Sequence, residues 1–386
     1  MTRLSLAVIA LAGLHSVAAI TTSNAEASFN TLLQWYNHTN GLFVPSTGWW
    51  NSANCITAIA DLAKIDAQVN IRAQTIFPET WVLAQLYNLQ MQKVFGPGYL
   101  VTTFYSDIFP EFPPGWNRPP PLQMTGFLND YYDDEGWWAL AWIAAYDVTN
   151  NPQYLATAQS IFEDMKKVYG TTGCGGGIWW NRAQTYVNAI ANELFLDVAA
   201  HLANRSGRSS AYYLSWAQKE WTWFKNSGMI NSEYTINDGL DNSCKNNGGT
   251  VWSYNQGVIL GGLTELSRAT NDAQYIDEAK KIADAAIAAL TTNGILHDPC
   301  EPNCGADGSQ FKGVFARNLQ LLQQASPEAR YKQFLQDNAD SIWAHDRNAN
   351  NELSLIWSGP FVQTANASTQ SSALDAITGA LAVAQT

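Results

Sequence analysis

Four acidic residues lie within the segment 130–135, which reads DYYDDE, and Trp137 and Trp138 follow after one glycine. The apolar run 139–145 comes next and predicts a helix, which places the acids in its first turn. Carboxylates are ordinary there, because a first turn has unpaired backbone N–H groups and the positive end of the helix dipole. Adjacent carboxyl groups beside flat aromatic rings also suit cleavage of a glycosidic bond, in which one carboxyl is ionised while the other holds a proton. Local evidence leaves both interpretations open.

Asp133 and Asp134 are the acids that could form a catalytic pair. A retaining mechanism needs carboxyl groups about 5–5.5 Å apart, whereas an inverting mechanism leaves room for water at roughly 6.5–9.5 Å. Helical neighbours point about 100° apart, so the pair must sit where the chain enters the helix to reach the shorter separation. The residue types alone do not decide which aspartate is the nucleophile. Glu135 is expected to point elsewhere on the helix and to matter little.

Other chemistries find little support in the composition. The five histidines do not stand at ligand spacing from other metal-binding side chains, and no Gly-x-Ser-x-Gly segment is present, so we expect no metal, no cofactor and no serine hydrolase. A net charge of −12 and a pI near 4.8 disfavour nucleic acid or an anionic membrane surface as a partner. Abundant amide, hydroxyl and aromatic side chains suit an extracellular protein that handles a neutral polar ligand.

The N-terminal residues predict export. Arg3, the apolar run 4–14 and small residues up to Ala19 have the pattern of a secretory signal over residues 1–19, and this run is too short to span a bilayer. The C-terminal segment 375–386 lacks the long apolar tail of a GPI signal. We therefore expect a secreted, soluble and monomeric glycoprotein without a membrane span. It would be located outside the cell or in a cell wall. Three N-glycosylation sequons agree with this expectation: they begin at Asn37, Asn204 and Asn366.

The five cysteines are an odd number, which implies at least one free or intermolecular thiol in an exported chain. Cys244, Cys300 and Cys304 lie in segments rich in Gly, Asn, Pro and Asp, whereas Cys55 opens a helical stretch. We expect a disulfide among the three loop cysteines rather than one that uses Cys55, and the full connectivity stays open.

Apolar residues recur at helical spacing along almost the whole chain. Tyr154, Tyr213, Tyr275 and Tyr331 follow polar or Pro-containing joints and recur every 56 to 62 residues, a period that fits one helical hairpin plus a loop. Six hairpins over residues 20–386 predict a single all-α domain, an (α/α)6 barrel with six inner and six outer helices. The predicted helices are 23–37, 53–68, 79–95, 133–149, 153–169, 182–204, 209–226, 252–270, 273–291, 311–325, 328–345 and 369–384.

Long loops are expected at one rim of this barrel, where they would converge on a cleft. Aromatic and amide-rich motifs stand where these loops enter the next helix. Trp179 and Trp180 follow three glycines, and backbone freedom beside them favours sugar platforms over core packing, although core packing explains most of the sixteen tryptophans. The expected loops are 96–129, 170–181, 227–251, 292–310 and 346–367.

Amide side chains could bind sugar hydroxyls without adding charge beside the acids. Asn188 and Asn192 stand four residues apart on one predicted helix, so their side chains share a face, and Asn255 and Gln256 open a later helix at the same rim. The alternative is that Asn188 and Asn192 bond to each other or to loop backbone inside the barrel, since most side-chain hydrogen bonds go to backbone or water.

In combination, these motifs resemble the endo-α-1,6-mannanases of glycoside hydrolase family 76, over nearly the whole mature chain. The matching residues are Asp133-Asp134 before Gly136-Trp137-Trp138, Gly176-Gly177-Ile178-Trp179-Trp180, Asn188, Asn192-Glu193, Trp252-Ser253-Tyr254-Asn255-Gln256-Gly257 and Phe311-Lys312-Gly313. The resemblance implies an (α/α)6 barrel and cleavage of α-1,6-mannosidic bonds with retention, with Asp133 as the nucleophile and Asp134 as the general acid/base. The expected substrate-binding residues are Trp137, Trp179, Trp180, Asn188, Asn192, Trp252, Tyr254, Asn255, Gln256 and Lys312.

The sequence is compatible with three functions. The first is a secreted endo-glycosidase acting on α-1,6-linked mannan or manno-oligosaccharides. The second is a wall-remodelling transglycosidase that uses the same acid pair but passes the sugar to a hydroxyl instead of water. The third is a carbohydrate-binding or wall-structural protein without activity, which the intact pair Asp133 and Asp134 disfavours.

Overall fold

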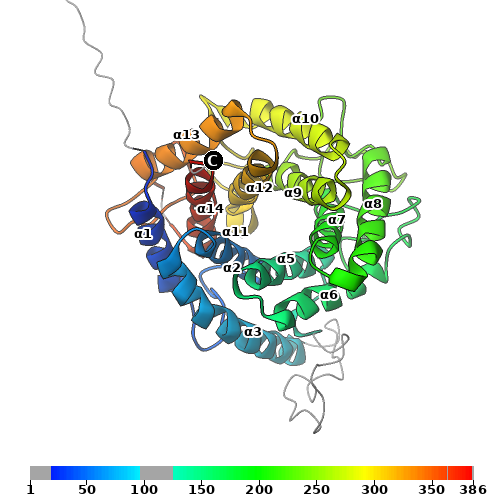
Figure 1. The fold of residues 1–386 in the computed structure, drawn as a ribbon, viewed down its shortest axis with the longest axis horizontal. Coiled ribbons are helices and arrows are strands. Elements are labelled where there is room, and N and C mark those ends of the chain that lie inside the picture. The colour runs from blue at the N-terminus through cyan, green and yellow to red at the C-terminus, as the bar shows by residue number, and fades with distance from the viewer. Residues whose placement is uncertain (1–18, 96–124, 363, 385–386) are drawn as a thin grey trace, which may run out of the picture.

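Two concentric rings of helices make up the computed structural model, which describes residues 19–95, 125–362 and 364–384. Figure 1 looks down the barrel axis, with one ring of helices inside the other. The inner helices are α2 (Trp49–Ala63), α5 (Tyr132–Thr149), α7 (Ala189–Ala203), α9 (Ser253–Thr270), α12 (Phe311–Ala325) and α14 (Ala367–Ala384). The outer helices are α1 (Thr22–Leu32), α3 (Ala67–Phe95), α6 (Pro152–Lys166), α8 (Ser210–Asn226), α10 (Gln274–Ala289) and α13 (Ala329–His345).

Side-chain chemistry explains which helices lie inside. The inner helices α7 and α14 are buried along almost their whole length, and most of their residues are apolar or small. The outer helix α10 buries only Ala279, Ile282, Ala283 and Ala286, one stripe that packs against the inner ring. Because α14 packs against both α12 and α2, the last inner helix joins the first, and the ring closes.

Glycines let the inner helices approach closely. A Cβ atom on Gly257 of α9 would lie 2.6 Å from the Cα atom of Phe315, and one on Gly313 of α12 would lie 2.5 Å from the Cα atom of Ser372. The backbones of α9, α12 and α14 therefore touch where a larger residue would force them apart.

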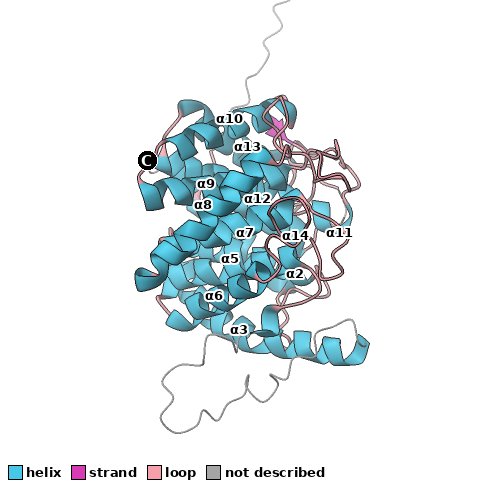
Figure 2. Ribbon diagram, turned by 90° about the vertical axis from the view of Figure 1, so that its right-hand side faces the viewer, coloured by secondary structure: helices cyan, strands magenta, loops and turns pink. Residues whose placement is uncertain are grey.

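The long loops gather at one end of the barrel, as Figure 2 shows, and each leads from an outer helix to the next inner one. They contain the short helix α11 (Gly305–Gly308) and a two-stranded antiparallel hairpin, β1 (Thr291–Thr292) with β2 (Ile295–Leu296), in which Thr291 pairs with Leu296. Short 3-10 turns complete the description: η1 (Leu33–Trp35), η2 (Thr125–Phe127) and η3 (Gly207–Ser209). Residues 96–124 of the loop predicted over 96–129 lie outside the described residues.

The prediction of six helical hairpins is confirmed, but two helix starts were wrong. The helix predicted over 79–95 begins at Ala67 and contains Pro78. The helix predicted to begin at 182 starts at Ala189, because Trp180 N–H donates to Tyr186 O and holds the preceding segment as a loop. Across the described ranges, no helix combines the length and apolarity needed to cross a membrane.

Two disulfides fasten the loops at this rim. Cys300 pairs with Cys304, a bridge between loop cysteines as expected, and Cys55 is a buried free thiol. Cys244 pairs with Cys174, a partner that the sequence did not identify. The Cys174–Cys244 bridge joins the loop before α7 to the loop before α9, 70 residues apart in the chain.

Candidate active site

A cleft of about 470 Å³ is lined by residues near the starts of the inner helices and in the loops that precede them. Its walls combine acids with aromatic rings, which is the composition expected for binding and cleaving a neutral sugar. The lining residues are Trp50, Tyr131, Asp133, Asp134, Trp137, Trp180, Tyr186, Asn188, Asp238, Tyr254, Asp307 and Phe311.

Asp133 and Asp134 occupy the first turn of α5, where the sequence placed them. The residue before this helix, Tyr131, has an extended backbone and forms an isolated bridge with Asn181, and Tyr132 N–H donates to Trp180 O at 2.9 Å. These backbone contacts fix the point at which the chain enters the helix. They also place Trp180 beside the acid pair.

The carboxyl group of Asp133 has hydrogen bonds that favour its ionised form. The indole Nε1–H of Trp180 donates to Asp133 Oδ2 at 3.0 Å. Burial raises the pKa of Asp133 to about 7, while the Trp180 bond and the backbone N–H groups of Asp133 and Asp134 act in the opposite direction. Asp133 Oδ1 is buried and has no hydrogen-bond partner among the described residues.

Asp134 has an environment that favours its protonated form. Burial is the main cause that raises its pKa well above the usual range, and the nearby charge of Asp133 adds to it. One hydrogen bond acts the other way, from Asn129 Nδ2 to Asp134 Oδ2 at 2.6 Å. The hydrogen bonds from Trp180 and the backbone thus favour the charge on Asp133, and burial beside that charge favours the proton on Asp134. This arrangement suits an ionised nucleophile beside a protonated acid.

A buried ionic network lies beneath this turn. Arg182 Nε donates to Asn129 O at 2.7 Å, and its Nη2 pairs with Asp164 Oδ2 at 2.7 Å and with Glu135 Oε1. Asn129 N–H also donates to Glu135 Oε1 at 3.3 Å. Glu135 does not line the cleft, but it is fully buried, and its bonds to Arg182 and Asn129 hold the loop that positions Asn129 against Asp134.

Four aromatic rings from four inner helices form the floor of the cleft. Trp50 stacks on Trp137 with ring centroids 5.6 Å apart, and Trp137 stacks on Tyr254 at 6.5 Å. Tyr254 stacks on Phe311 at 3.8 Å, and Phe311 lies 6.3 Å from Trp50. The rings thus form a closed cycle of contacts in the cleft lining, where their exposed parts can meet the C–H faces of sugars.

Two further acids line the cleft, and the sequence interpretation missed both. Tyr186 OH donates to Asp238 Oδ2 at 2.7 Å, and Trp50 Nε1–H donates to Asp307 Oδ1 at 2.9 Å. Asp238 lies in the loop that the Cys174–Cys244 bridge fastens, and Asp307 lies in α11, directly after the Cys300–Cys304 bridge. Each carboxylate is therefore held at the rim by a cross-linked loop.

Six of the predicted site residues line this one cleft: Asp133, Asp134, Trp137, Trp180, Asn188 and Tyr254. Asn188 is the N-cap of α7, where its Oδ1 accepts from Ala191 N–H at 3.4 Å. Its Nδ2 has no hydrogen bond within the described part of the chain, so it is available to a ligand.

The other predicted binding residues do not reach the cleft. Asn192 is fully buried: its Oδ1 accepts from Ile178 N–H at 2.7 Å, and its Nδ2 donates to Ile178 O and Asn188 O at 3.1 and 2.7 Å. Gln256 pairs in the same way with the backbone of Ile236, at 2.8 and 2.9 Å. The alternative of backbone bonding inside the barrel thus describes Asn192, and Gln256, for which no such alternative was considered, bonds to backbone as well.

Lys312, Trp179, Trp252 and Asn255 also lie away from the cleft surface. Lys312 is 1% exposed, with its Nζ bound to Glu301 and to Leu355 O, both at 2.6 Å. Trp179 donates to Thr171 Oγ1 at 3.0 Å, and Trp252 packs edge-on against Phe311 outside the cleft lining. Asn255 is fully buried, and its side chain has no hydrogen-bond partner in the described ranges.

A signal for Trp50 was present in the sequence. Gly48-Trp49-Trp50 repeats the Gly-Trp-Trp pattern of residues 136–138, and each copy opens an inner helix, α2 or α5. No comparable pattern marks Asp238 or Asp307, because the sequence of a Gly- and Asn-rich loop does not determine the direction in which an acidic side chain points. The described residues contain no group of three metal-binding side chains.

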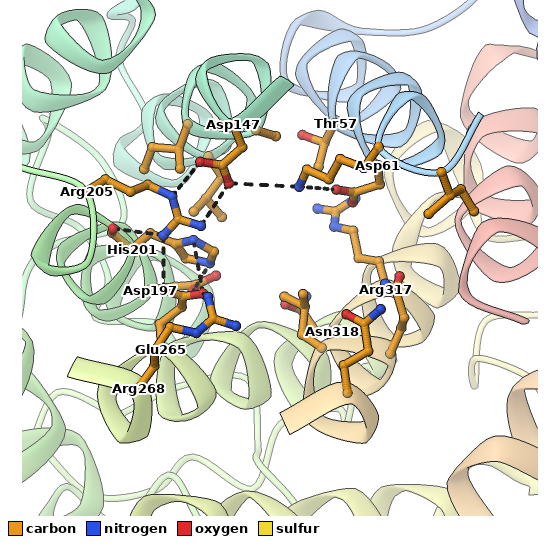
Figure 3. A pocket seen from close by; sticks show the side chains of 18 residues that line it. Thr57, Asp61, Asp147, Asp197, His201, Arg205, Glu265, Arg268, Arg317 and Asn318 are labelled. Carbon is orange, nitrogen blue, oxygen red and sulfur yellow. Dashed lines mark hydrogen bonds and ion pairs between the residues drawn. The ribbon is translucent and has the colours of Figure 1, made fainter. Parts of the chain in front are cut away.

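The opposite end of the barrel carries a second pocket, of about 340 Å³, drawn in Figure 3. A chain of ion pairs crosses it: Lys64–Asp147 at 3.9 Å, Arg205–Asp147 at 2.8 Å, Arg205–Glu265 at 3.0 Å and Arg268–Glu265 at 2.6 Å. The cations stand where α2, α7 and α9 end, and helix C-termini favour positive charge. The described lining has no Trp, Tyr or Phe ring, so these pairs join helix ends instead of forming a sugar platform.

Comparison with known proteins gives one family. The sequence model of glycosyl hydrolase family 76 matches residues 16–386. The mannan endo-1,6-α-mannosidase DFG5 of Candida albicans is 26% identical over 325 residues, 79% of this chain and 65% of that protein. The mannan endo-1,6-α-mannosidase DCW1 of Saccharomyces cerevisiae is 31% identical over 236 residues, 54% of this chain and 52% of that protein. The chain thus spans between about half and two thirds of these relatives.

Solved structures confirm the barrel fold. The α-1,6-mannanase GH76A of a Salegentibacter species has a TM-score of 0.73 and 21% identity, covering 93% of this chain and 98% of that chain. A second structure is an inactive variant of that enzyme, with two adjacent aspartates replaced by asparagine, in complex with α-1,6-mannotriose. Its TM-score is 0.73 at 20% identity, covering 94% of this chain and 99% of that chain.

Proposed function

Because the chain belongs to glycosyl hydrolase family 76, we propose that it is a retaining endo-glycosidase that hydrolyses α-1,6-mannosidic bonds in mannan. Both curated relatives named above are mannan endo-1,6-α-mannosidases, and the Salegentibacter enzyme binds α-1,6-mannotriose. The inactive variant of that enzyme carries changes at two adjacent aspartates, which supports a catalytic role for the adjacent pair Asp133 and Asp134. The substrate is then an α-1,6-linked mannan or manno-oligosaccharide.

The proposal rests on one observation: the surroundings of Asp133 favour its ionised form, and those of Asp134 favour its protonated form. Trp180 and two backbone N–H groups favour ionised Asp133, whereas burial and the charge of Asp133 favour protonated Asp134. The carboxylate of Asp133 attacks C1 of the mannose while Asp134 donates its proton to the departing glycosidic oxygen. Asp134, now ionised, then takes a proton from water, whose oxygen displaces Asp133 from C1 and restores both groups. Two displacements at C1 give net retention.

The floor of the cleft binds the chain on either side of the broken bond. Trp50, Trp137, Tyr254 and Phe311 form one continuous apolar surface, so consecutive mannose units can pack across it. Asn188 Nδ2 supplies a neutral donor at the edge. An open cleft with platforms on several helices suits cleavage within a polymer.

We also propose that residues 20–386 act as one secreted catalytic domain after removal of residues 1–19. The apolar run 4–14 after Arg3 supports export, and closure of the inner ring by α14 supports a single domain. A secreted, monomeric glycoprotein that works outside the cell or in a cell wall follows from the same sequence features.

The test is product analysis on a linear α-1,6-mannan with the purified chain. Hydrolysis releases new reducing ends and short oligosaccharides, and nuclear magnetic resonance of the first products shows the α anomer. Products longer than the substrate would instead assign the chain as a transglycosidase, in which a sugar hydroxyl replaces water. Binding without either product would overturn the catalytic proposal. A β-1,4-mannan is the control and should remain intact.

A further inference from the structure

We propose that Asn37 and Asn366 carry N-linked glycans that share one surface groove, and that Asn204 remains unmodified although it too begins a sequon. The inference rests on the proposed export, since the modification needs passage through a secretory compartment. It is independent of the cleavage chemistry. Hydrogen bonding of the three amide nitrogens distinguishes the sites.

Modification changes the hydrogen-bonding capacity of an asparagine. The amide nitrogen forms a bond to C1 of the first sugar of a lipid-diphosphate-linked oligosaccharide, the C1–O bond to the diphosphate breaks, and the amide loses one proton as the lipid diphosphate leaves. The product nitrogen retains one N–H in place of two. A glycosylated asparagine can therefore keep its Oδ1 bonds and one donor bond, but it cannot keep two donor bonds from Nδ2.

Asn37 meets this condition. Its Oδ1 accepts from Thr39 N–H at 2.9 Å, and its Nδ2 makes a single bond within the described residues, to Val44 O at 3.3 Å. Thr39, the hydroxyl residue of the sequon, is exposed in the turn closed by the Asn37–Leu42 bridge. The fold can hold a sugar on Asn37 without losing either bond.

Asn366 meets it as well. Its Oδ1 accepts from Thr369 N–H at 3.0 Å at the start of α14, and no hydrogen bond from its Nδ2 exists in the described part of the chain. Ser368, the hydroxyl residue of this sequon, is 1% exposed and bonded to Thr47. Transfer to Asn366 must therefore precede docking of α14, and the helix cap then forms around the modified side chain.

Asn204 fails the condition. Its Nδ2 donates to Glu265 Oε2 at 2.7 Å, to Glu265 O at 2.9 Å and to Ala200 O at 3.3 Å. These acceptors use both amide hydrogens, and they tie the end of α7 to α9 beside the ion pair of Arg205 with Glu265. A sugar on this nitrogen would displace at least one of those acceptors from the buried contact between α7 and α9, where the Glu265 side chain is 2% exposed. Chains modified here would not complete the barrel.

The two accepting sites open onto one groove. A groove of about 560 Å³ is lined by Asn37 and Asn366 together with Trp35, Val44 and Pro45. Trp35 stands two residues before Asn37 and is only partly buried, so its ring can pack against the C–H face of the first sugar. The glycans would cover an apolar surface that the protein itself leaves open to water.

Peptide mass spectrometry of the full chain, secreted from a eukaryotic host, tests the proposal. Glycans should be released by an amidase in ¹⁸O-labelled water, which marks each formerly modified asparagine as aspartate. We expect high occupancy at Asn37 and Asn366 and no label at Asn204. Label at Asn204 in properly folded, monodisperse protein, or no label at Asn37 and Asn366, would overturn it. Failure of the chain to leave the cell would refute export, and failure to cut mannan would refute the proposed function, so each failure is distinguishable.

Three variants give matched controls. Asn37→Gln and Asn366→Gln should each lower the mass of the secreted protein by one glycan. Ser206→Ala destroys the third sequon without touching Asn204 and should leave the mass of the glycans unchanged. Oxidative footprinting of Trp35 tests the shared groove: its labelling should rise at least threefold after deglycosylation of the wild type, and in Asn37→Gln before any treatment. Unchanged labelling of Trp35 in both cases would overturn the groove assignment.

Discussion

The indole nitrogen of Trp180 lies 3.0 Å from Oδ2 of Asp133, across 47 residues of sequence, and it is a side-chain donor to the proposed nucleophile. The bond favours the ionised carboxylate and leaves Oδ1 free among the described residues. A ring expected to act as a sugar platform thus also acts on the charge of the catalytic pair.

Trp180→Phe should shift the acidic limb of the kcat/KM profile to higher pH. Loss of the donor destabilises ionised Asp133 and raises its pKa above about 7, so a larger fraction is protonated and inactive at a given pH. We expect a loss of roughly 10- to 100-fold at pH 6 that shrinks at higher pH, because one hydrogen bond to a charged group contributes about 1.5–3 kcal/mol. Trp179→Phe is the control: its indole donates to Thr171, outside the cleft, and the profile should not move.

Asp133→Asn should abolish turnover, with a loss well above ~10³-fold, because an amide cannot form the covalent intermediate. The measurement is release of reducing ends from α-1,6-mannan. With added azide, a mutated nucleophile should give a mannosyl azide of inverted configuration. Glu233→Gln, a change at an exposed acid, provides the control. Activity close to that of the wild type would remove Asp133 from the mechanism.

Asp134→Ala should slow substrates with poor leaving groups far more than activated aryl mannosides. Only the former need a proton as the glycosidic bond breaks. Comparison of kcat/KM for a manno-oligosaccharide and a dinitrophenyl mannoside measures the difference. Equal losses on the two substrates would contradict the acid role.

Glu135→Gln should destabilise the protein and weaken catalysis through the loop that holds Asn129. The change removes the charge that pairs with Arg182 inside the protein, at a cost on the order of 3 kcal/mol. Denaturant unfolding measures the loss, and the matched change Glu233→Gln should cost under about 0.5 kcal/mol. If the free energy of unfolding is unchanged, the buried network does not support the catalytic turn.

We expect Asn188 to bind substrate and Asn192 to stabilise the fold. Asn188→Ser keeps a capping oxygen for α7 but removes the amide donor in the cleft, so KM should rise several-fold with little change in Tm. Asn192→Asp removes both donor bonds to backbone carbonyl groups, so Tm should fall while the pH profile of the surviving protein stays in place. The opposite pattern would exchange their roles.

The free energy of unfolding should fall between pH 5 and pH 8. Burial raises the pKa of Asp298 to about 6, of Asp133 and Asp346 to about 7 and of Asp375 to about 8. In the unfolded chain these aspartates ionise at about pH 3.9. Between pH 5 and pH 8 the folded state therefore binds more protons than the unfolded state, and a rise in pH favours unfolding. Tm measured across the range tests the sign. A Tm that rises toward pH 8 would show that these carboxyl groups are ionised inside the protein.

The sequence by itself determined the helical hairpins, their inner and outer alternation and the place of the acid pair. Helical periodicity is a local property, and a first turn follows from the residues that surround it. Asp133, Asp134, Trp137 and Tyr254 were therefore found together: each opens an inner helix, and in a closed barrel those starts share one rim.

Only the tertiary structure decided what the loops and amides do. Asn192 and Gln256 carry the same functional group as Asn188, yet their neighbours are the backbones of Ile178 and Ile236, which the sequence does not place beside them. The same holds for Asp238 and Asp307, whose orientation depends on cross-linked loops, and for Trp180, whose indole reaches Asp133 through a backbone bridge between Tyr131 and Asn181. A side chain's role depends on which partner satisfies its polar atoms, and partners far apart in the chain meet only when the barrel closes.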